Sequence, residues 1–301
     1  MIIMKKLTAV LIALLMFLTS CACAENSFQI VCPEGAPALA VSAVKENVQT
    51  IPADTIVTAF SAEEADFVIA PVNAGAMLYA KGKSTYRLAA VVTWGNLVFA
   101  SQIADFTPEM MDGKVITLFG ENTINSAVAL YILQQKGIVP SEVQYLAGAK
   151  NTQELLLNDQ NAIVMTAEPA VSAAKAKNSA VTAYSLSDLY QDITGEDGFV
   201  QAGLFVRDQT AQEKPEEVQE WLAIIRESAG RCETDPEAAA KDAVEMGIMP
   251  NEKIASLAIP NCHIRYVPSA EAKKQIEELA EIDLSMFGGE VPADDFYYGA
   301  E

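Results

Sequence analysis

Three polar side chains, Asn122, Thr123 and Asn125, stand where an apolar run ends and a helical pattern begins. Amide and hydroxyl groups donate and accept hydrogen bonds, and the first N–H groups of a helix have no partner inside the helix. Together these groups predict a binding site for a neutral polar group or a small anion. A second interpretation remains open, in which Asn122 or Thr123 only caps the helix.

Residue types that perform catalysis are scarce in this chain. The one histidine is His263, and its neighbour Cys262 would point to the opposite face of an extended strand. No G-x-S-x-G segment supplies a serine nucleophile. The acidic pair Asp294 and Asp295 stands in a C-terminal tail, with no apolar pocket around it to shift a pKa. The sequence therefore favours a binding protein over an enzyme, and it predicts no catalytic residue, metal site or cofactor.

The elements that position the polar segment form a strand–loop–helix unit. Residues 115–119 are apolar and partly β-branched, as in a buried strand. Gly120 interrupts this run, and apolar residues then recur with a helical period from Ile124 until Gly137. Ligands bind beside such loops in open α/β sheets.

Similar units occur elsewhere in the chain. Residues 65–71 form an apolar run that leads into a helical stretch at 73–81, just as residues 161–169 lead into 170–177. A further strand is expected near 55–59, where β-branched residues gather. This weak repeat predicts two similar α/β lobes that face one cleft.

Composition narrows the class of protein and its partners. A length of 301 residues predicts about two folded domains, and a hydrophobic content of 51% excludes a disordered chain. The formal net charge of −20 argues against nucleic acid or an anionic membrane surface as a partner, because binding phosphate requires clustered Lys and Arg.

Residues 1–24 have the pattern of an export signal and anchor region. Two lysines precede a short apolar run at 7–18, which is too short to span a bilayer as a mature helix. The segment Leu18-Thr19-Ser20-Cys21 then resembles the lipobox of bacterial lipoproteins, which implies cleavage before Cys21 and lipidation of that residue. The alternative is ordinary signal cleavage after Ala24, and both alternatives predict an exported protein.

The five cysteines leave several pairings open. With Cys21 lipidated, the remaining four are Cys23, Cys32, Cys232 and Cys262, which allow three full pairings. Outside the cytoplasm a disulfide is expected more readily than inside it. Cys232–Cys262 is the preferred pair because both lie in the C-terminal third, and the alternative is that both are small buried hydrophobes.

Short motifs follow one another in a characteristic order along the whole mature chain. They are Leu18-Thr19-Ser20-Cys21, Asp66–Pro71, Asp112-Gly113-Lys114, Ala167-Glu168-Pro169, Leu204–Arg207 before Pro215, Ile259–Cys262 and Asp294–Tyr298. In this order the chain resembles the solute-binding lipoproteins of ABC transporters with the type II periplasmic-binding-protein fold. It is most similar to the group that binds nitrate, sulfonates and thiamine precursors.

The resemblance implies an α/β fold of two lobes joined by two hinge crossings, with a ligand cleft between the lobes. The crossings correspond to residues 93–96 and 198–203. The first lobe is then discontinuous, built from 27–94 and 201–301, and the second lobe is 95–200. Ligand contacts both lobes only in the closed state, so binding stabilises closure.

The same resemblance implies a set of ligand-binding residues, drawn from the crossings and from the loops at 33–37, 71–75, 120–125 and 166–169. They are Glu34, Gly35, Asn73, Trp94, Gly120, Asn122, Thr123, Asn125, Glu168 and Gln201.

Alternatives remain open for two of these residues. Trp94 either stacks on a flat ring of the ligand or packs in the hinge. Glu168 is expected in the cleft because the family places this Glu-Pro pair beside the ligand; the alternative is an exposed carboxylate favoured at a helix start. The chain also departs from the nitrate and sulfonate binders, because these loops contain no Arg or Lys.

The implied partners are a small molecule, an ABC permease with its ATPase, and a membrane reached through the lipid anchor at Cys21. The protein is expected to act as a monomer on the outer face of the cytoplasmic membrane. Two other functions remain as alternatives, a ligand-sensing surface lipoprotein and an enzyme similar to thiamine pyrimidine synthase. That enzyme is expected to use a histidine-rich iron site, which a chain with one histidine does not provide.

Overall fold

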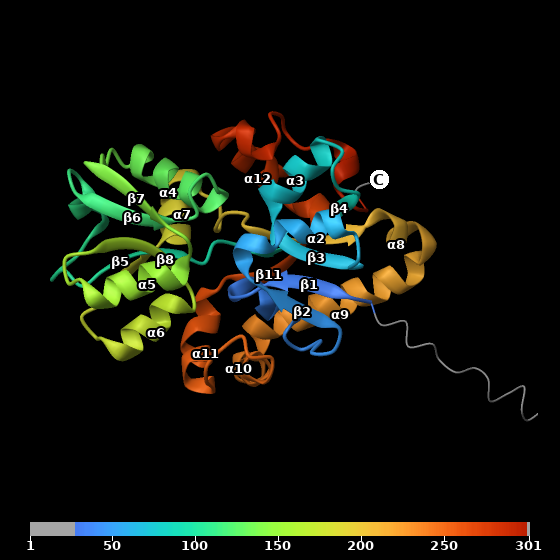
Figure 1. Cartoon of the computed structure of the whole chain (residues 1–301), viewed down its shortest axis with the longest axis horizontal. Helices are drawn as coiled ribbons and strands as arrows, with labels where there is room; N and C mark the ends of the chain where they lie inside the picture. Colours follow the sequence, from blue (N-terminus) through green and yellow to red (C-terminus); the bar gives the residue numbers. More distant parts are fainter. Residues whose placement is uncertain (1–27, 300–301) are drawn as a thin grey trace, which may run out of the picture.

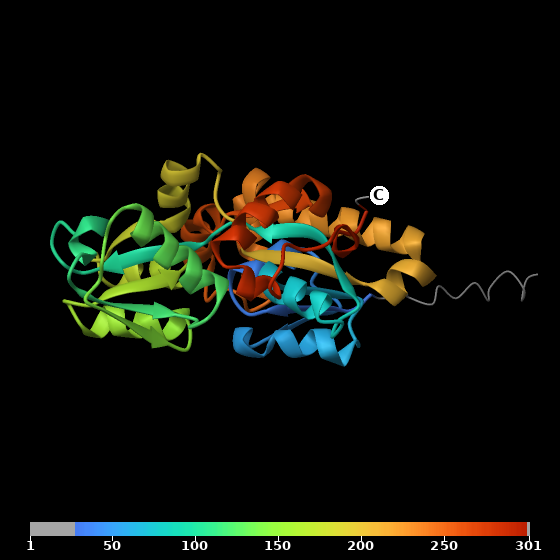
Figure 2. The same ribbon diagram turned by 90° about the horizontal axis from the view of Figure 1, so that it is seen from above.

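The chain folds into two α/β lobes that lie side by side (Figure 1). The computed structural model describes residues 28–299, so the predicted signal segment and the lipidation of Cys21 lie outside the described residues. A view turned by 90° shows the same two lobes (Figure 2).

The first lobe is built on a six-stranded sheet of order β11-β4-β10-β3-β1-β2. Its central strand β10 runs antiparallel to β3 and β4, whereas β1 is parallel to β2 and β3. The strands are β1 (Ile30–Pro33), β2 (Val48–Ile51), β3 (Phe67–Pro71), β4 (Tyr86–Thr93), β10 (Ala202–Arg207) and β11 (Ile264–Pro268).

The second lobe is built on a five-stranded sheet of order β7-β6-β8-β5-β9. Strand β6 is parallel to β7 and β8, and β5 is antiparallel to β8 and β9. The strands are β5 (Leu97–Ser101), β6 (Val115–Phe119), β7 (Glu142–Leu146), β8 (Ile163–Ala167) and β9 (Thr182–Ser185).

Helices cover both faces of the first sheet, so its inner strands β3, β4 and β10 are buried on both sides. Within β3, Phe67 and Ile69 pack with α9 (Pro215–Thr234) and η1 (Ala36–Val41), while Val68 and Ala70 pack on the other face with α2 (Val57–Ala62), α3 (Val72–Ala80) and α12 (Ser269–Ile282). The helical segments of this lobe are η1 (Ala36–Val41), η2 (Ala53–Thr55), α2 (Val57–Ala62), α3 (Val72–Ala80), α8 (Asp208–Glu213), α9 (Pro215–Thr234), α10 (Pro236–Glu245), α11 (Glu252–Ala258), η4 (Ile259–Asn261), α12 (Ser269–Ile282), η5 (Leu284–Phe287) and η6 (Asp294–Phe296).

The second sheet is covered by fewer helices. They are η3 (Pro108–Met111), α4 (Ile124–Gln135), α5 (Ala149–Asn158), α6 (Ala170–Lys177) and α7 (Leu186–Thr194). Between residues 28 and 299, no helix is long and apolar enough to cross a membrane.

One sequence-based expectation about an element is wrong. The strand expected near 55–59 is the start of helix α2, and the second strand of the lobe is β2 instead. Ile56, Ala59 and Phe60 are buried at the i, i+3, i+4 spacing of a helix. Burial of this face in the lobe therefore determines that these β-branched residues are helical, despite their intrinsic preference for strands.

Two segments connect the lobes and pack against each other. Residues 94–96 join β4 to β5, which lie in different sheets, so no hairpin forms there. Gly95 has a φ of 82°, and a Cβ at this position would lie 2.5 Å from the ring of Phe199. Gly198 has a φ of 81°, and its Cβ would lie 2.6 Å from the Trp94 carbonyl oxygen. Glycine is needed at both positions because any side chain would separate the two connecting segments.

Candidate functional site between the two lobes

All four predicted loops follow the carboxyl ends of strands, namely β1, β3, β6 and β8. The strands β3, β6 and β8 lead directly into α3, α4 and α6, which begin at residues 72, 124 and 170. Since β6 and β8 are parallel neighbours, the starts of α4 and α6 lie at the same edge of the second sheet. This arrangement brings polar side chains from separate parts of the sequence to one place.

A hydrogen-bonded group of residues, here called the interlobe cluster, consists of Asn96, Asn125, Glu168 and Gln201, and Glu168 joins it through its backbone. The Gln201 Nε2 atom donates to Asn125 Oδ1 at 3.0 Å, and Gln201 Oε1 accepts from the Asn96 N–H at 3.2 Å. Asn96 Nδ2 donates to the Glu168 carbonyl at 3.0 Å, and the Glu168 N–H donates to the Asn96 carbonyl at 2.9 Å. The cluster therefore contains three predicted site residues.

The backbone of Gln201 attaches the interlobe cluster to the first lobe. Its N–H donates to the Thr93 carbonyl at 3.0 Å, and its carbonyl accepts from the Val72 N–H at 3.1 Å. Gln201 is thus fixed to the ends of β4 and β3 through its backbone, while its side chain reaches α4 of the second lobe.

Glu168 is the charged member of the interlobe cluster, and it is buried, with 5% of its surface exposed. Its carboxylate accepts hydrogen bonds from the Ser172 hydroxyl at 3.0 Å and from the Ser172 N–H at 3.3 Å. Burial raises the pKa of Glu168, and the bonds from Ser172 offset part of that rise. The exposed helix-start carboxylate considered from the sequence is therefore excluded.

Asn73 lies at the start of α3, next to Val72, and is nearly buried with 9% exposure. Its Nδ2 atom donates to the Met286 carbonyl at 3.5 Å, while its Oδ1 atom has no hydrogen-bond partner. Asn96 Oδ1 and Thr93 Oγ1 are also buried without a partner. Buried polar atoms are usually paired, so these two amide oxygens and this hydroxyl group need an explanation.

In the loop before α4, the polar side chains hydrogen-bond mainly to the backbone of the same loop. The hydroxyl groups of Thr123 and Ser126 both donate to the Gly120 carbonyl, at 2.6 and 2.8 Å. Asn122 is exposed and has a left-handed φ of 57°. No side chain caps α4, so the capping alternative for Asn122 and Thr123 does not hold.

Trp94 packs in the hinge and is nearly buried. The guanidinium of Arg265 lies 4.6 Å from the centre of its ring, and the indole N–H donates to the Arg265 carbonyl at 3.0 Å. Arg265 also binds the Asp197 carboxylate at 2.7 Å. These residues line a hollow of about 410 Å³ together with Gly198 and residues of α12. The packing alternative for Trp94 therefore has direct contacts in its favour.

Glu34 and Gly35 lie at the end of β1, where Glu34 is exposed and Gly35 begins η1 with a φ of 101°. The Glu34 N–H donates to the Ile51 carbonyl at 2.9 Å. Neither residue belongs to the interlobe cluster, and their role in binding stays a prediction.

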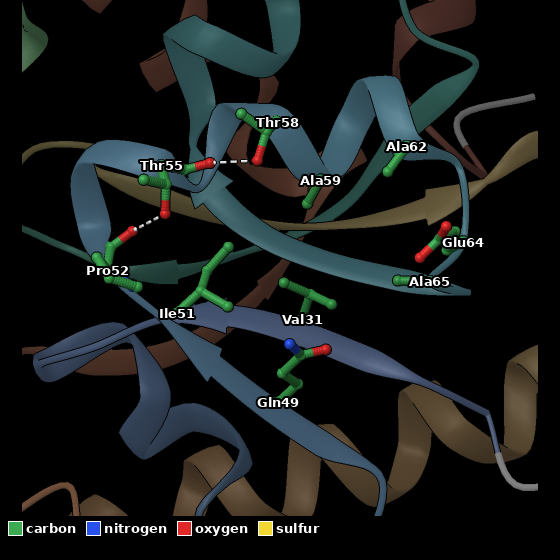
Figure 3. Close-up of a pocket in the computed structure, with 10 residues that line it drawn as sticks. All are labelled: Val31, Gln49, Ile51, Pro52, Thr55, Thr58, Ala59, Ala62, Glu64 and Ala65. Carbon is green, nitrogen blue, oxygen red and sulfur yellow. Dashed lines mark hydrogen bonds between the residues drawn. The ribbon is translucent and has the colours of Figure 1, made fainter.

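A separate hollow of about 340 Å³ lies in the first lobe between the edge of the sheet and α2. Figure 3 shows its lining of apolar and hydroxyl side chains, among them Val31, Ile51 and Thr58. No predicted site residue lines it. Its polar groups are partly paired with one another, because the Thr58 hydroxyl donates to the Thr55 carbonyl at 2.7 Å.

The predicted disulfide is not formed. Cys232 and Cys262 are both free and buried, as is Cys32. The alternative from the sequence, that both are small buried hydrophobes, holds, because Cys232 of α9 and Cys262 after η4 belong to one apolar cluster of the first lobe. Within the described part of the chain, no group of three or more His, Cys, Asp or Glu side chains is placed to hold a metal ion.

Sequence reasoning missed Asn96, although it lies in a crossing that was predicted. The signal available was an amide residue directly after Trp94-Gly95, between two apolar runs. Ser172 was also missed, because a serine inside a helix carries no distinctive sequence signal.

Comparison with solved structures defines the class of fold. An ABC transporter protein from Parabacteroides distasonis is similar with a TM-score of 0.78 at 19% identity, covering 92% of this chain and 100% of that chain. The periplasmic aliphatic sulphonate binding protein SsuA from Escherichia coli is similar with a TM-score of 0.64 at 13% identity, covering 86% of each chain. A Candida albicans protein with the generic periplasmic binding protein fold has a TM-score of 0.57 at 10% identity, covering 90% and 93%. The chain therefore has the periplasmic-binding-protein fold.

The sequence itself identifies the family. The profile of the family described as NMT1/THI5 like matches residues 46–239, which is more than half of the chain, and the protein belongs to that family. No curated protein matches the chain. The predicted fold class and the predicted family resemblance are confirmed.

Proposed function

We propose that this protein is the extracytoplasmic solute-binding component of an ABC importer. It captures a small molecule between its two lobes and presents the closed form to a permease and its ATPase. The observation that carries the proposal is the interlobe cluster, in which Gln201 joins the end of β4 to the start of α4. A ligand that contacts both sides of this cluster binds the closed form more tightly and shifts the population toward it.

The similar structures support this reading, because they include an ABC transporter protein and a sulphonate-binding protein. The lobe boundaries proposed from the sequence agree with the membership of the two sheets. All strands of the first sheet lie in 27–94 and 201–301, and all strands of the second sheet lie in 95–200. Export, lipidation at Cys21, action as a monomer and a role without catalysis belong to the same proposal.

The test is a thermal-shift screen on a soluble form that starts at Glu25 and contains every described residue. The panel includes thiamine precursors, nucleobases, sulfonates, nitrate and amino acids. A ligand at a hundred times its Kd adds roughly 2.7 kcal/mol of stability, which raises the Tm by several degrees. The shift should disappear in Gln201→Ala and persist in Gln209→Ala, an exposed residue on α8. Stabilisation that survives Gln201→Ala would place the binding site elsewhere.

A further inference from the structure

Two adjacent carboxylates follow α7 of the second lobe and bind side chains of the first lobe. The Glu196 carboxylate pairs with Lys274 Nζ of α12 at 3.1 Å and accepts from Gln275 Nε2 at 3.4 Å. The Asp197 carboxylate pairs with Arg265 Nη1 of β11 at 2.7 Å. Both ion pairs therefore join the segment after α7 to elements of the first lobe.

Each partner is attached to its own lobe. The Glu196 N–H donates to the Thr194 hydroxyl of α7 at 3.1 Å, so this residue is fixed to the second lobe. Arg265 belongs to β11 of the first sheet, and its guanidinium lies against the Trp94 ring. The Arg265 Nη2 atom also donates to the Asp197 carbonyl at 3.2 Å. Because these contacts already orient the guanidinium, little side-chain freedom is lost when it pairs.

The two ion pairs belong to an arrangement in which the lobes touch. Helix α11 contacts α6, and α12 contacts α4, so helices of the two lobes meet at two further places. Other ion pairs of α12 stay within the first lobe, as in Lys273–Asp294 and Lys274–Glu278. A rotation of one lobe against the other would change the distances across Lys274–Glu196 and Arg265–Asp197 and leave the pairs within the first lobe intact.

Solvent and salt reach both interlobe pairs. Asp197 and Lys274 are exposed, and Asp197, Arg265 and Glu196 line the hollow of about 410 Å³ beside the hinge. Salt screens charges over about 10 Å at 0.1 M and over about 3 Å at 1 M. An exposed ion pair stabilises only slightly, but a population of two lobe arrangements responds to small differences in free energy.

We propose that Glu196 and Asp197 form an interlobe latch, which holds the lobes in contact at low ionic strength and releases them as salt screens its two ion pairs. The latch acts in the protein without a ligand. The inference therefore goes beyond the proposed function and does not depend on it, and its failure would leave solute binding untouched.

The experiment measures the distance between two nitroxide labels on the soluble form from Glu25. The labels are attached at Ser256→Cys on α11 and Asn158→Cys at the end of α5, which are exposed positions on different lobes. The thiols of the described residues are buried and leave the labels to the introduced cysteines. Pulsed electron double resonance then gives the populations of the lobe arrangements.

Removing the latch should shift these populations at low salt. Glu196→Gln combined with Asp197→Asn should raise the population with separated lobes about two- to fivefold. Sodium chloride at about 1 M should cause a similar rise in the protein that carries only the labels. Equal populations in all of these samples would overturn the proposal. A salt response that persists unchanged in the double variant would overturn it as well, because other charges would then be responsible.

A matched control and a charge exchange test the specificity of the latch. Asp294→Asn removes an ion pair of α12 within the first lobe and should leave the populations unchanged. A similar rise in this control would overturn the latch. Glu196→Lys and Lys274→Glu should each raise the population with separated lobes, whereas the two changes together should restore the original population. A failure to restore it would show that Glu196 and Lys274 do not act as a pair.

Discussion

The side-chain amide of Gln201 donates to Asn125 Oδ1 across 3.0 Å and thereby joins the strand that re-enters the first lobe to the first turn of α4 in the second lobe. The same side chain accepts from the Asn96 N–H at 3.2 Å. One glutamine thus bridges both connecting segments and a helix start.

Gln201→Ala should loosen this bridge. Removing a typical hydrogen bond costs about 1 kcal/mol, and the opened form should become more populated. Small-angle scattering should report a larger radius of gyration, with a Tm lowered by a few degrees. The matched control is Gln209→Ala, which removes an exposed bond to Glu213 on α8. An unchanged radius in both variants would mean that Gln201 does not hold the lobes.

Gly198→Ala should destabilise the hinge. A Cβ would lie 2.6 Å from the Trp94 carbonyl oxygen, and the φ of 81° is unfavourable for alanine. We expect a loss of about 2 kcal/mol or more in the free energy of unfolding, measured by denaturant titration. Gly230→Ala is the control, because Gly230 lies inside α9 with nothing within 4 Å of its Cβ position. That change should add roughly 0.5–1 kcal/mol, since alanine favours helix. Equal effects of the two substitutions would contradict the hinge packing.

His263 should make the protein less stable as the pH falls. Burial lowers its pKa below the ordinary value of 6.5, and Asp188 and Asp197 oppose this only in part. The folded state therefore binds fewer protons than the unfolded state, so stability is kept above pH 6.5 and is lost as the pH falls through the folded pKa. His263→Asn should flatten this dependence, because asparagine tolerates the φ of 49°.

Proton NMR can follow His263 directly, since it is the one histidine of the chain. A midpoint at or above 6.5 in the folded protein would be inconsistent with the burial argument.

The three buried thiols should be unreactive in the folded protein. Burial raises the pKa of Cys32 and of Cys232 to about 12, and that of Cys262 well above its usual range. Because the thiolate is the reactive species, Ellman's reagent at pH 8 should react with the soluble form only after denaturation, and should then detect Cys32, Cys232 and Cys262. Detection of Cys32 alone would contradict this prediction and support the Cys232–Cys262 disulfide that the sequence predicted.

Local elements were readable from the sequence because their signals are local. The apolar run at Val115–Phe119 and the helical period of Ser269–Ile282 coincide with β6 and α12. In each case the hydrophobic period and the residues at the ends of the element agree. The loops at the carboxyl ends of strands were predictable for the same reason.

Tertiary contacts decided the rest. Residues 55–59 became part of a helical segment because Ile56 and Phe60 are buried in the first lobe. The partners of Gln201 and Glu168 lie 76 and 72 positions away at Asn125 and Asn96, and no local pattern encodes such distances. The sequence alone thus determined which polar segments follow the ends of strands. Only the packing of the two sheets determined which of these polar groups contact one another. Hydrogen bonds between the lobes depend on three-dimensional position and not on spacing along the chain.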